Sequence, residues 1–140
     1  MKKISSWLFV CAAVLFGLVC LMPVQAEAAQ QIEWHTTNLY YELTEDNTPE
    51  NILVIEGYFV NNTDKYINYF HEFNLTATIT DDGGYTGTIK GTFRNFEKMI
   101  DPFSRSDHRF RIRNAEIIWP VDSYNVKRGY IKWKYSGAAG

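Results

Sequence analysis

Apolar and polar residues alternate along much of the chain, and no long segment repeats apolar residues with the period of a helix. The clearest example runs from Ile67 to Thr80, where odd-numbered positions are mostly apolar and even-numbered positions mostly polar. Successive side chains of a strand point to opposite faces of a sheet. The pattern therefore predicts a strand with one buried face, which includes His71, and with Phe70 exposed on the opposite face.

Turn-forming residues separate seven such runs, which are rich in β-branched and aromatic residues. The expected strands are 31–43, 52–61, 66–80, 85–96, 103–113, 117–124 and 129–135. The residues Asp-Asp-Gly-Gly at 81–84 and Lys-Arg-Gly at 127–129 are expected to form hairpin turns, and residues 95–100 fit one helical turn. The sequence predicts an all-β, antiparallel β-sandwich of about seven strands in a single domain.

The N-terminal segment has the features of an export signal. Met1-Lys2-Lys3 is a basic start, residues 7–22 are almost wholly apolar, and small-residue cleavage patterns end at Ala26 and Ala28. These features are typical of a secretory signal peptide. The apolar run of about 16 residues is shorter than the roughly 20 that a membrane-spanning helix needs. We expect a signal peptide over 1–28, no membrane anchor after cleavage, and a secreted or cell-surface domain over 29–140.

Cys11 and Cys20 are the two cysteines of the sequence, and both lie inside this signal segment. The expected exported domain therefore has no disulfide, thiolate metal site or cysteine nucleophile. Lipoprotein anchoring needs a small residue directly before the acceptor cysteine, whereas Val10 and Val19 precede these two. The Lys-Lys start and the cysteine-free domain suggest a bacterial source.

A short polar segment, Asn61 to Lys65, separates two apolar runs within residues 56–67, which read EGYFVNNTDKYI. Asn and Asp side chains bond to their own backbone and tolerate left-handed φ values. The segment from Asn61 to Lys65 is therefore interpreted as a turn rather than a ligand site. Gly57, in the middle of the preceding strand, indicates a bulge or a close approach of another backbone.

This stretch, the alternating strand after it and the Asp-Asp-Gly-Gly turn resemble small bacterial exported immunoglobulin-like β-sandwich domains. In such domains a stretch of the form G-x-V-x-N-x-S/T-D/G-K-x-I makes the corner between two strands, and a later strand begins at a Pro- or Ser-rich edge. Residues 100–104 (IDPFS) match that edge loosely. The resemblance covers residues 50–113. It implies an immunoglobulin-like fold that binds or scaffolds at the cell surface, and it supplies no catalytic residues.

Charged residues are distributed unevenly. The sequence has a net charge of −2, and loss of Lys2 and Lys3 leaves twelve basic against sixteen acidic residues, about −4. Residues 27–64 contain eight acids and no Lys or Arg, whereas residues 105–134 contain eight bases and three acids. Either the acidic and basic strands become neighbours in the fold, or one charged face docks a partner. Opposite charges also allow copies of the chain to associate head to tail.

Five basic residues form the first candidate binding site. They are Arg109, Arg111 and Arg113 on one expected strand, and Lys132 and Lys134 on another. If these strands are neighbours, the five cations make one patch that could meet another protein or an anionic cell-envelope polymer. Outward-facing acids such as Glu56 and Glu72 could equally pair with them.

Three aromatic residues form the second candidate site, because they lie opposite the expected core faces. They are Tyr41, Tyr58 and Phe70. Tyr40 and Tyr41 are adjacent, so they cannot both face inward in a regular strand. Exposed rings can stack on sugars or anchor a protein interface.

Patterns for catalysis and metal binding are weak. His35, His71 and His108 fall on different expected strands without ligand spacing, and His71 is expected to be a core residue. The turn at 81–84 lacks the ligand ladder of a calcium loop, and the sequence has no Gly-x-Ser-x-Gly motif. Asn-x-Thr sequons at Asn61 and Asn74 matter only in a host that glycosylates. We expect no enzyme activity, no cofactor and no metal site, and an acidic exported chain does not favour nucleic acid.

The sequence thus predicts an exported, non-catalytic binding module that mediates protein–protein interaction or adhesion at the bacterial cell surface. A carbohydrate-binding module with exposed aromatic residues is the alternative, and a small secreted hydrolase is a third reading. A cluster of coplanar exposed rings would favour sugar, and a flat apolar patch rimmed by Arg would favour protein. A cleft that holds two carboxylates, or a His–acid pair, would favour the hydrolase.

Overall fold

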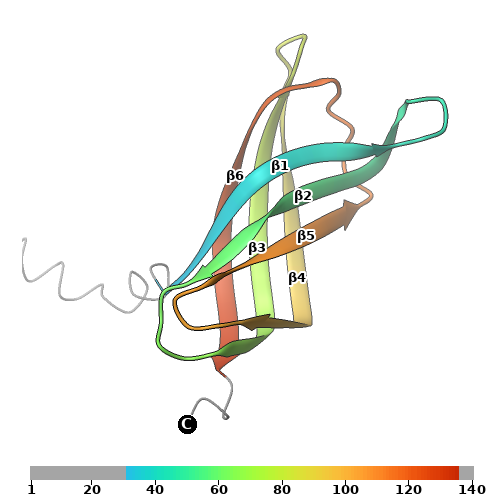
Figure 1. Ribbon diagram of the computed structural model, residues 1–140. Coiled ribbons are helices and arrows are strands. Elements are labelled where there is room, and N and C mark those ends of the chain that lie inside the picture. Colours follow the sequence, from blue (N-terminus) through green and yellow to red (C-terminus); the bar gives the residue numbers. More distant parts are fainter. Residues whose placement is uncertain (1–30, 136–140) are drawn as a thin grey trace, which may run out of the picture. The chain divides into compact units, whose positions relative to one another are not determined.

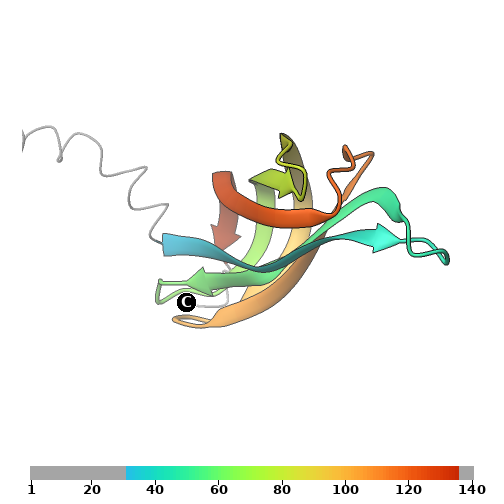
Figure 2. The same cartoon turned by 90° about the horizontal axis from the view of Figure 1, so that it is seen from above.

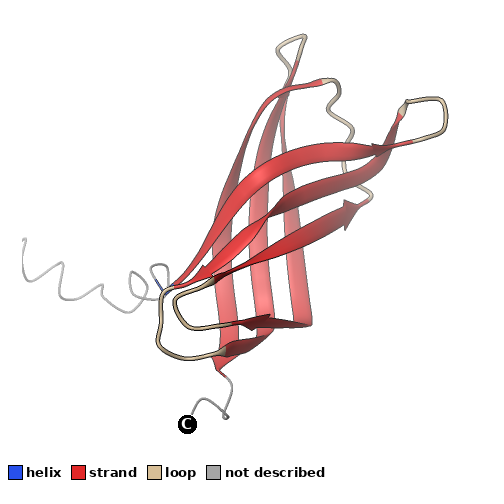
Figure 3. Cartoon of the chain, viewed as in Figure 1, coloured by secondary structure: helices blue, strands red, loops and turns tan. Residues whose placement is uncertain are grey.

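The computed structural model of the chain describes residues 31–135, which form six strands (Figure 3). The strands are β1 (Ile32–Leu43), β2 (Pro49–Asn61), β3 (Ile67–Asp81), β4 (Thr86–Ile100), β5 (Arg105–Arg113) and β6 (Val121–Tyr135). In this part of the chain, no helix has the length and apolar character needed to cross a membrane. The predicted signal peptide lies outside the described residues.

The strands form two antiparallel sheets that face each other, with the order β1-β2-β5 in one and β4-β3-β6 in the other (Figures 1 and 2). Hairpins within a sheet join β1 to β2 and β3 to β4. The three remaining connections, β2–β3, β4–β5 and β5–β6, pass from one sheet to the other. The predicted all-β class and antiparallel pairing are confirmed.

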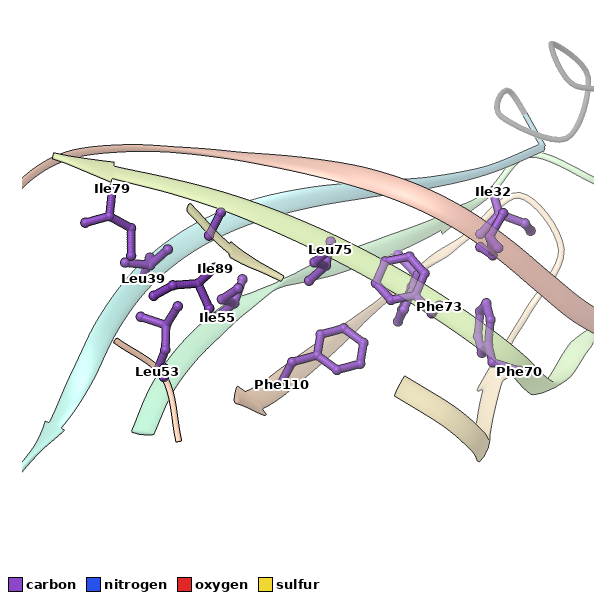
Figure 4. Close-up of a cluster of buried hydrophobic side chains, with 14 of the residues drawn as sticks. Ile32, Leu39, Leu53, Ile55, Phe70, Phe73, Leu75, Ile79, Ile89 and Phe110 are labelled. Carbon is purple, nitrogen blue, oxygen red and sulfur yellow. The ribbon is translucent and has the colours of Figure 1, made fainter. Parts of the chain in front are cut away.

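Side chains from both sheets meet in one apolar core (Figure 4). Phe59 from β2 stacks on Phe70 from β3 with ring centroids 4.8 Å apart, and Trp34 from β1 meets Phe59 edge to face at 4.9 Å. Large rings bury much apolar area per side chain. The aromatic cluster therefore provides much of the packing between the two sheets.

The structure has six strands where the sequence predicted seven, because residues 121–124 of the expected run 117–124 and the whole expected run 129–135 belong to one strand, β6. Residues 117–120 lie in the connection before it. The segment Lys127-Arg128-Gly129 is not a turn. In the pairing of β6 with β3, Leu75 lies opposite Arg128 and Phe73 lies opposite Ile131. Gly129 and Tyr130 are therefore the two residues of a bulge opposite a single β3 residue, and a bulge lets the strand continue where a hairpin would end it.

The prediction that Phe70 is exposed was wrong, because Phe70 is fully buried in the core. Phe73 is also buried, although it lies three positions after Phe70 and a regular strand would place the two on opposite faces. The pairing of β3 with β6 shifts register between Phe70 and Glu72, which resets the alternation. The same shift moves His71 out of the core, and its ring instead contacts Tyr69 at 4.9 Å.

The segment 95–100 is strand rather than a helical turn, and β4 continues through it to Ile100, which pairs with Ile67 in the core. Asn95 has a positive φ of 55° within this segment. Asn tolerates this left-handed conformation better than most residues. The irregularity brings Phe93 and Phe96 to the core side, where both pack against the buried cluster.

The polar segment from Asn61 to Lys65 after β2 is a turn, as the sequence predicted. The buried Asn61 side chain stabilises it. The Asn61 amide nitrogen donates to the backbone oxygens of Lys65 at 2.7 Å, Asp101 at 3.1 Å and Ile100 at 3.2 Å. Its amide oxygen accepts hydrogen bonds from the backbone nitrogen and the hydroxyl of Thr63. One buried side chain therefore ties the β2–β3 turn to the β4–β5 connection.

Gly57 lies where the backbone of β1 approaches β2 closely, as expected. It pairs with Thr36, next to the register shift between Thr36 and Asn38. A Cβ at this position would overlap the His35 carbonyl oxygen and would lie 2.7 Å from the Trp34 ring. Only glycine fits this approach without a shift of the backbone.

Candidate functional site

The outer face of β5 carries the three predicted arginines, and two of them are paired with acids. Arg111 makes two 2.8 Å hydrogen bonds to the Glu42 carboxylate in β1, and Arg109 lies 2.9 Å from the Glu56 carboxylate in β2. The pKa of Arg111 is raised by its bond to Glu42. The acid-rich β1 and β2 thus lie in the same sheet as the base-rich β5, and β2 pairs with it directly. This agrees with the interpretation in which acidic and basic strands come together in the fold.

The five predicted cations do not form one patch, because β5 and β6 belong to different sheets. Lys132 lies opposite Glu72, and Lys134 lies opposite Tyr69, on the β4-β3-β6 sheet. The prediction of one patch of five cations applied only if the two basic strands were neighbours. Strand order is a tertiary property that the alternation pattern does not contain.

The aromatic candidates also separate. Tyr41 is 3% exposed, so it is a core residue like Phe70, and the prediction of exposure was wrong for both. The Tyr41 hydroxyl instead bonds to the β5–β6 connection. Tyr58 does face outward, on β2, where the His35 ring stacks on it at 5.0 Å and the Arg105 guanidinium lies 4.7 Å from its ring centroid.

The structure assembles a different group of cations on the outer face of the β4-β3-β6 sheet, which we call the cationic face. Its members are Lys90 and Arg94 on β4, and Lys127, Lys132 and Lys134 on β6. The cationic face also holds two acids, Glu72 on β3 and Glu97 on β4. Bases therefore exceed acids by three on this surface, and all five basic residues are exposed.

Strand pairing arranges these charges in three cross-strand rows. The first row is Lys90–Thr76–Lys127, the second is Arg94–Glu72–Lys132, and the third is Glu97–Tyr69–Lys134. The first row contains two bases and no acid. Positive charge is therefore greatest at the Thr76 row and declines towards the Tyr69 row.

The bulge at Gly129 and Tyr130 places Lys127 and Lys132 on the same face. Lys132 lies five positions after Lys127, so a regular strand would place the two on opposite faces of the sheet. The extra residue shifts the alternation by one position between them. The same shift leaves Arg128 on the core side opposite Leu75, where burial lowers the pKa of Arg128.

Most of these cations have no acidic partner. The second row is bridged, because Arg94 Nε lies 2.8 Å from the Glu72 carboxylate. None of the ion pairs formed within residues 31–135 involves Lys90, Lys127, Lys132 or Lys134. The four lysines are thus exposed charges that the fold does not neutralise.

Hydroxyl and amide side chains continue the cationic face beyond the first row. Thr78 pairs with Thr88 and Asn125, and Thr80 pairs with Thr86 and Ser123. The hydroxyls of Thr80 and Thr86 lie 2.8 Å apart and bond to each other. Short polar side chains beside the lysines give this part of the sheet a surface of hydrogen-bonding groups.

A shallow hollow of about 590 Å³ lies on the opposite sheet, and it combines polar groups from three strands. Its lining residues are Thr37, Glu56, Gly57, Tyr58, Arg105, Asp107, His108 and Arg109. Arg109 engages Glu56, and the His108 ring stacks on Phe96 at 5.4 Å. Burial, with a smaller contribution from Lys98, lowers the pKa of His108 to about 4.

An apolar groove of about 700 Å³ lies beside the C-terminal half of β1. Its lining residues are Leu39, Tyr40, Tyr41, Glu42, Leu43, Trp119, Pro120 and Val121. Leu43 and Trp119 are 48% and 45% exposed. Glu42 is the one charged residue among the lining residues, and its carboxylate already accepts two hydrogen bonds from Arg111.

Sequence reasoning missed Lys90, Arg94 and Lys127 as members of the site. The alternation in β4 does place Lys90 and Arg94 opposite the core-facing Ile89 and Phe93, so a signal was present. Only the pairing of β4 and β6 with the central β3 shows that these residues share a face with Lys132. No cluster of three potential metal-ligating side chains occurs within residues 31–135.

Comparison of the chain with protein-family models, with curated proteins and with solved structures gave no match in any of the three. The arrangement of the chain's own side chains is therefore the basis for a functional proposal.

Proposed function

We propose that this protein is an exported, non-catalytic binding module that adheres to an anionic partner at the bacterial cell surface through the cationic face. The partner is an acidic protein or an anionic polymer of the cell envelope. The observation that carries the proposal is the group of four exposed lysines without acidic partners on one sheet face. Surface charge of one sign steers and holds partners of the opposite sign.

We also propose that the fold is immunoglobulin-like. In that fold the first, second and fifth strands are neighbours in one sheet, and the third and sixth are neighbours in the other. The orders β1-β2-β5 and β3-β6 agree with this arrangement. The fourth strand, β4, pairs with β3 rather than with β5, and the described residues contain no seventh strand after β6. The shared neighbours support an immunoglobulin-like relationship with these two departures.

A sedimentation assay with isolated bacterial envelopes tests the proposed adhesion. The purified chain is expected to sediment with the envelopes, and the triple variant Lys90→Ser, Lys127→Ser, Lys132→Ser is expected to remain in solution. The variant Arg105→Ser, Arg113→Ser on the opposite sheet is the control, because it also removes exposed cations. Equal retention of the wild-type chain and the triple variant would contradict the proposed site.

The apolar groove favours a second candidate function, carbohydrate binding, because Trp119 and Tyr40 place two aromatic side chains there. Sugar sites combine ring stacking with hydrogen bonds to hydroxyl groups. A glycan array with the wild-type chain and a Trp119→Ser variant tests this candidate. A glycan signal that disappears in the variant would support sugar binding in the groove, and absence of any signal would count against it.

A further inference from the structure

We infer that the ligand of the cationic face is a linear polymer of phosphodiester-linked polyols that lies along β3. The inference rests on the proposed function and names the class of partner. The first row supplies the central contact. Lys90 and Lys127 flank Thr76 in register on the two neighbouring strands. Since neighbouring strands are about 4.8 Å apart, the two lysine backbones are roughly 10 Å apart. Two flexible lysine side chains at this separation can reach one anion above the Thr76 hydroxyl.

The second row extends the contact along the same strand. Glu72 lies four residues from Thr76, which corresponds to about 13 Å along a strand. Arg94 neutralises Glu72, so Lys132 is the remaining cation of this row. A ligand that runs along β3 would therefore meet lysines at two successive levels. An extended chain with repeated negative charges matches this arrangement better than a compact anion does.

The cations of this face suit phosphate. Arginine meets carboxylate and phosphate alike with a planar pair of donors, whereas lysine binds phosphate as a point charge and needs no planar partner. The one arginine of the cationic face is already bound to Glu72, and the four free cations are lysines. On the other sheet, Arg109 and Arg111 are likewise paired with Glu56 and Glu42 of the chain itself.

The apolar content of the cationic face does not fit a protein partner. Protein interfaces have an apolar centre with aromatic or aliphatic anchors. Among the described residues, the exposed large apolar side chains lie mainly in or near the connections at the two ends of the sheets. Tyr130 in the bulge is the one exposed large apolar side chain close to the first two rows. A single exposed ring also provides little stacking for nucleic-acid bases.

The polar side chains beside the lysines fit a polyol. The Thr78 and Thr80 rows present hydroxyl and amide groups from all three strands of the sheet. Hydroxyls both donate and accept hydrogen bonds, as the hydroxyls of a polyol do. Phosphates on the lysine rows with polyol units on the threonine rows would use both kinds of group on the cationic face.

Calorimetric titration of the purified chain with poly(glycerol phosphate) tests this inference. We expect binding that weakens as salt increases, because cations on the ligand are released when lysines replace them. The variant Lys90→Ser, Lys127→Ser is expected to bind about tenfold to a hundredfold more weakly, from the loss of two cation contacts. Its plot of log affinity against log salt should be less steep by roughly two units. The variant Arg105→Ser, Arg113→Ser should bind like the wild-type chain.

Two further polymers separate failure of this inference from failure of the proposed function. If poly-L-glutamate, or a single-stranded DNA oligomer, binds as tightly as poly(glycerol phosphate) and depends on the same lysines, the phosphodiester–polyol inference is wrong and the anionic docking site stands. If the Arg105→Ser, Arg113→Ser variant loses as much affinity as the lysine variant, binding follows net charge and the site is wrong. If no polyanion binds and the envelope assay is also negative, both the inference and the proposed function fail.

Discussion

The Tyr41 hydroxyl donates a hydrogen bond of 2.6 Å to the backbone oxygen of Glu116, which lies seventy-five residues later in the chain. The same hydroxyl accepts a hydrogen bond from the backbone nitrogen of Ile118 at 3.1 Å. One side chain of β1 thereby fixes the connection between β5 and β6. Burial is the main cause that raises the pKa of the Tyr41 hydroxyl above its ordinary value.

Replacement of Tyr41 by Phe should destabilise the fold by about 1–3 kcal/mol, because it leaves two backbone groups of the β5–β6 connection without their partner. The ring itself remains in place, so the loss measures the hydroxyl alone. Urea unfolding followed by circular dichroism measures the change. Tyr124→Phe is the matched control, since Tyr124 is 40% exposed. An equal, small effect of both substitutions would show that the Tyr41 hydrogen bonds add little stability.

Replacement of Asn61 by Ala should destabilise the fold by ~2–4 kcal/mol, because four backbone groups that bond to this buried amide lose their partner at once. Hydrogen exchange should increase at Thr63, whose backbone nitrogen bonds to the Asn61 side chain. Asn62→Ala is a useful comparison, because Asn62 is exposed. If the two substitutions have the same effect, the turn is held by its backbone rather than by the buried Asn61 amide.

Replacement of Gly57 by Ala should cost about 2 kcal/mol or more, because the added methyl group overlaps the β1 backbone and backbone atoms cannot rotate away. Gly83→Ala is the control. A Cβ at Gly83 would meet only Asp81 Oδ1, at an ordinary 3.4 Å. Thermal unfolding of the two variants compares them directly, and a Gly57→Ala variant as stable as Gly83→Ala would contradict the close approach.

The stability of the fold should fall as the pH decreases from 6.5 towards 4, in part because His108 resists protonation. Its pKa in the folded chain is about 4 against an ordinary value of 6.5. The neutral form is favoured in the folded state, so this contribution is complete above pH 6.5 and is lost as the pH falls through the folded pKa. A His108→Phe variant retains a ring beside Phe96 and cannot titrate.

Chemical unfolding of both proteins at a series of pH values measures the difference. Carboxylates titrate in the same range in both proteins, so the comparison isolates His108. The stability of the wild-type chain should decrease more than that of His108→Phe between pH 6.5 and 4. Parallel pH profiles would show that His108 titrates normally in the folded chain.

Local sequence patterns predicted most of the strands and their turns. The alternation around Leu75 and Ile79 identified the central strand β3, and Asp81 with the two following glycines marked its turn. The run from Asn61 to Lys65 was correctly read as a turn because its residues favour left-handed and side-chain-bonded conformations. These features depend on residues close together in the chain, which is why the sequence contains them.

The candidate site was predicted only in part. Lys132 and Lys134 were identified because they alternate with apolar residues near the C-terminal end of β6. The arginines of β5 were identified in the same way, but Glu42 and Glu56 from strands far away in sequence pair with two of them. A charge that a distant acid neutralises cannot be distinguished from a free charge by its own neighbours in the sequence.

The sequence by itself determined the all-β class of residues 31–135 and the approximate bounds of β1, β2, β3 and β5, because the order of apolar and polar residues follows the two-residue period of a strand. It ended β4 too early and divided β6 into two strands. Tertiary structure decided which residues share a face. An extra residue in β3 places Phe70 with Phe73 in the core, and a bulge in β6 places Lys127 with Lys132 on the cationic face. Each bulge shifts the alternation by one residue, and its position depends on pairing with a partner strand rather than on local composition.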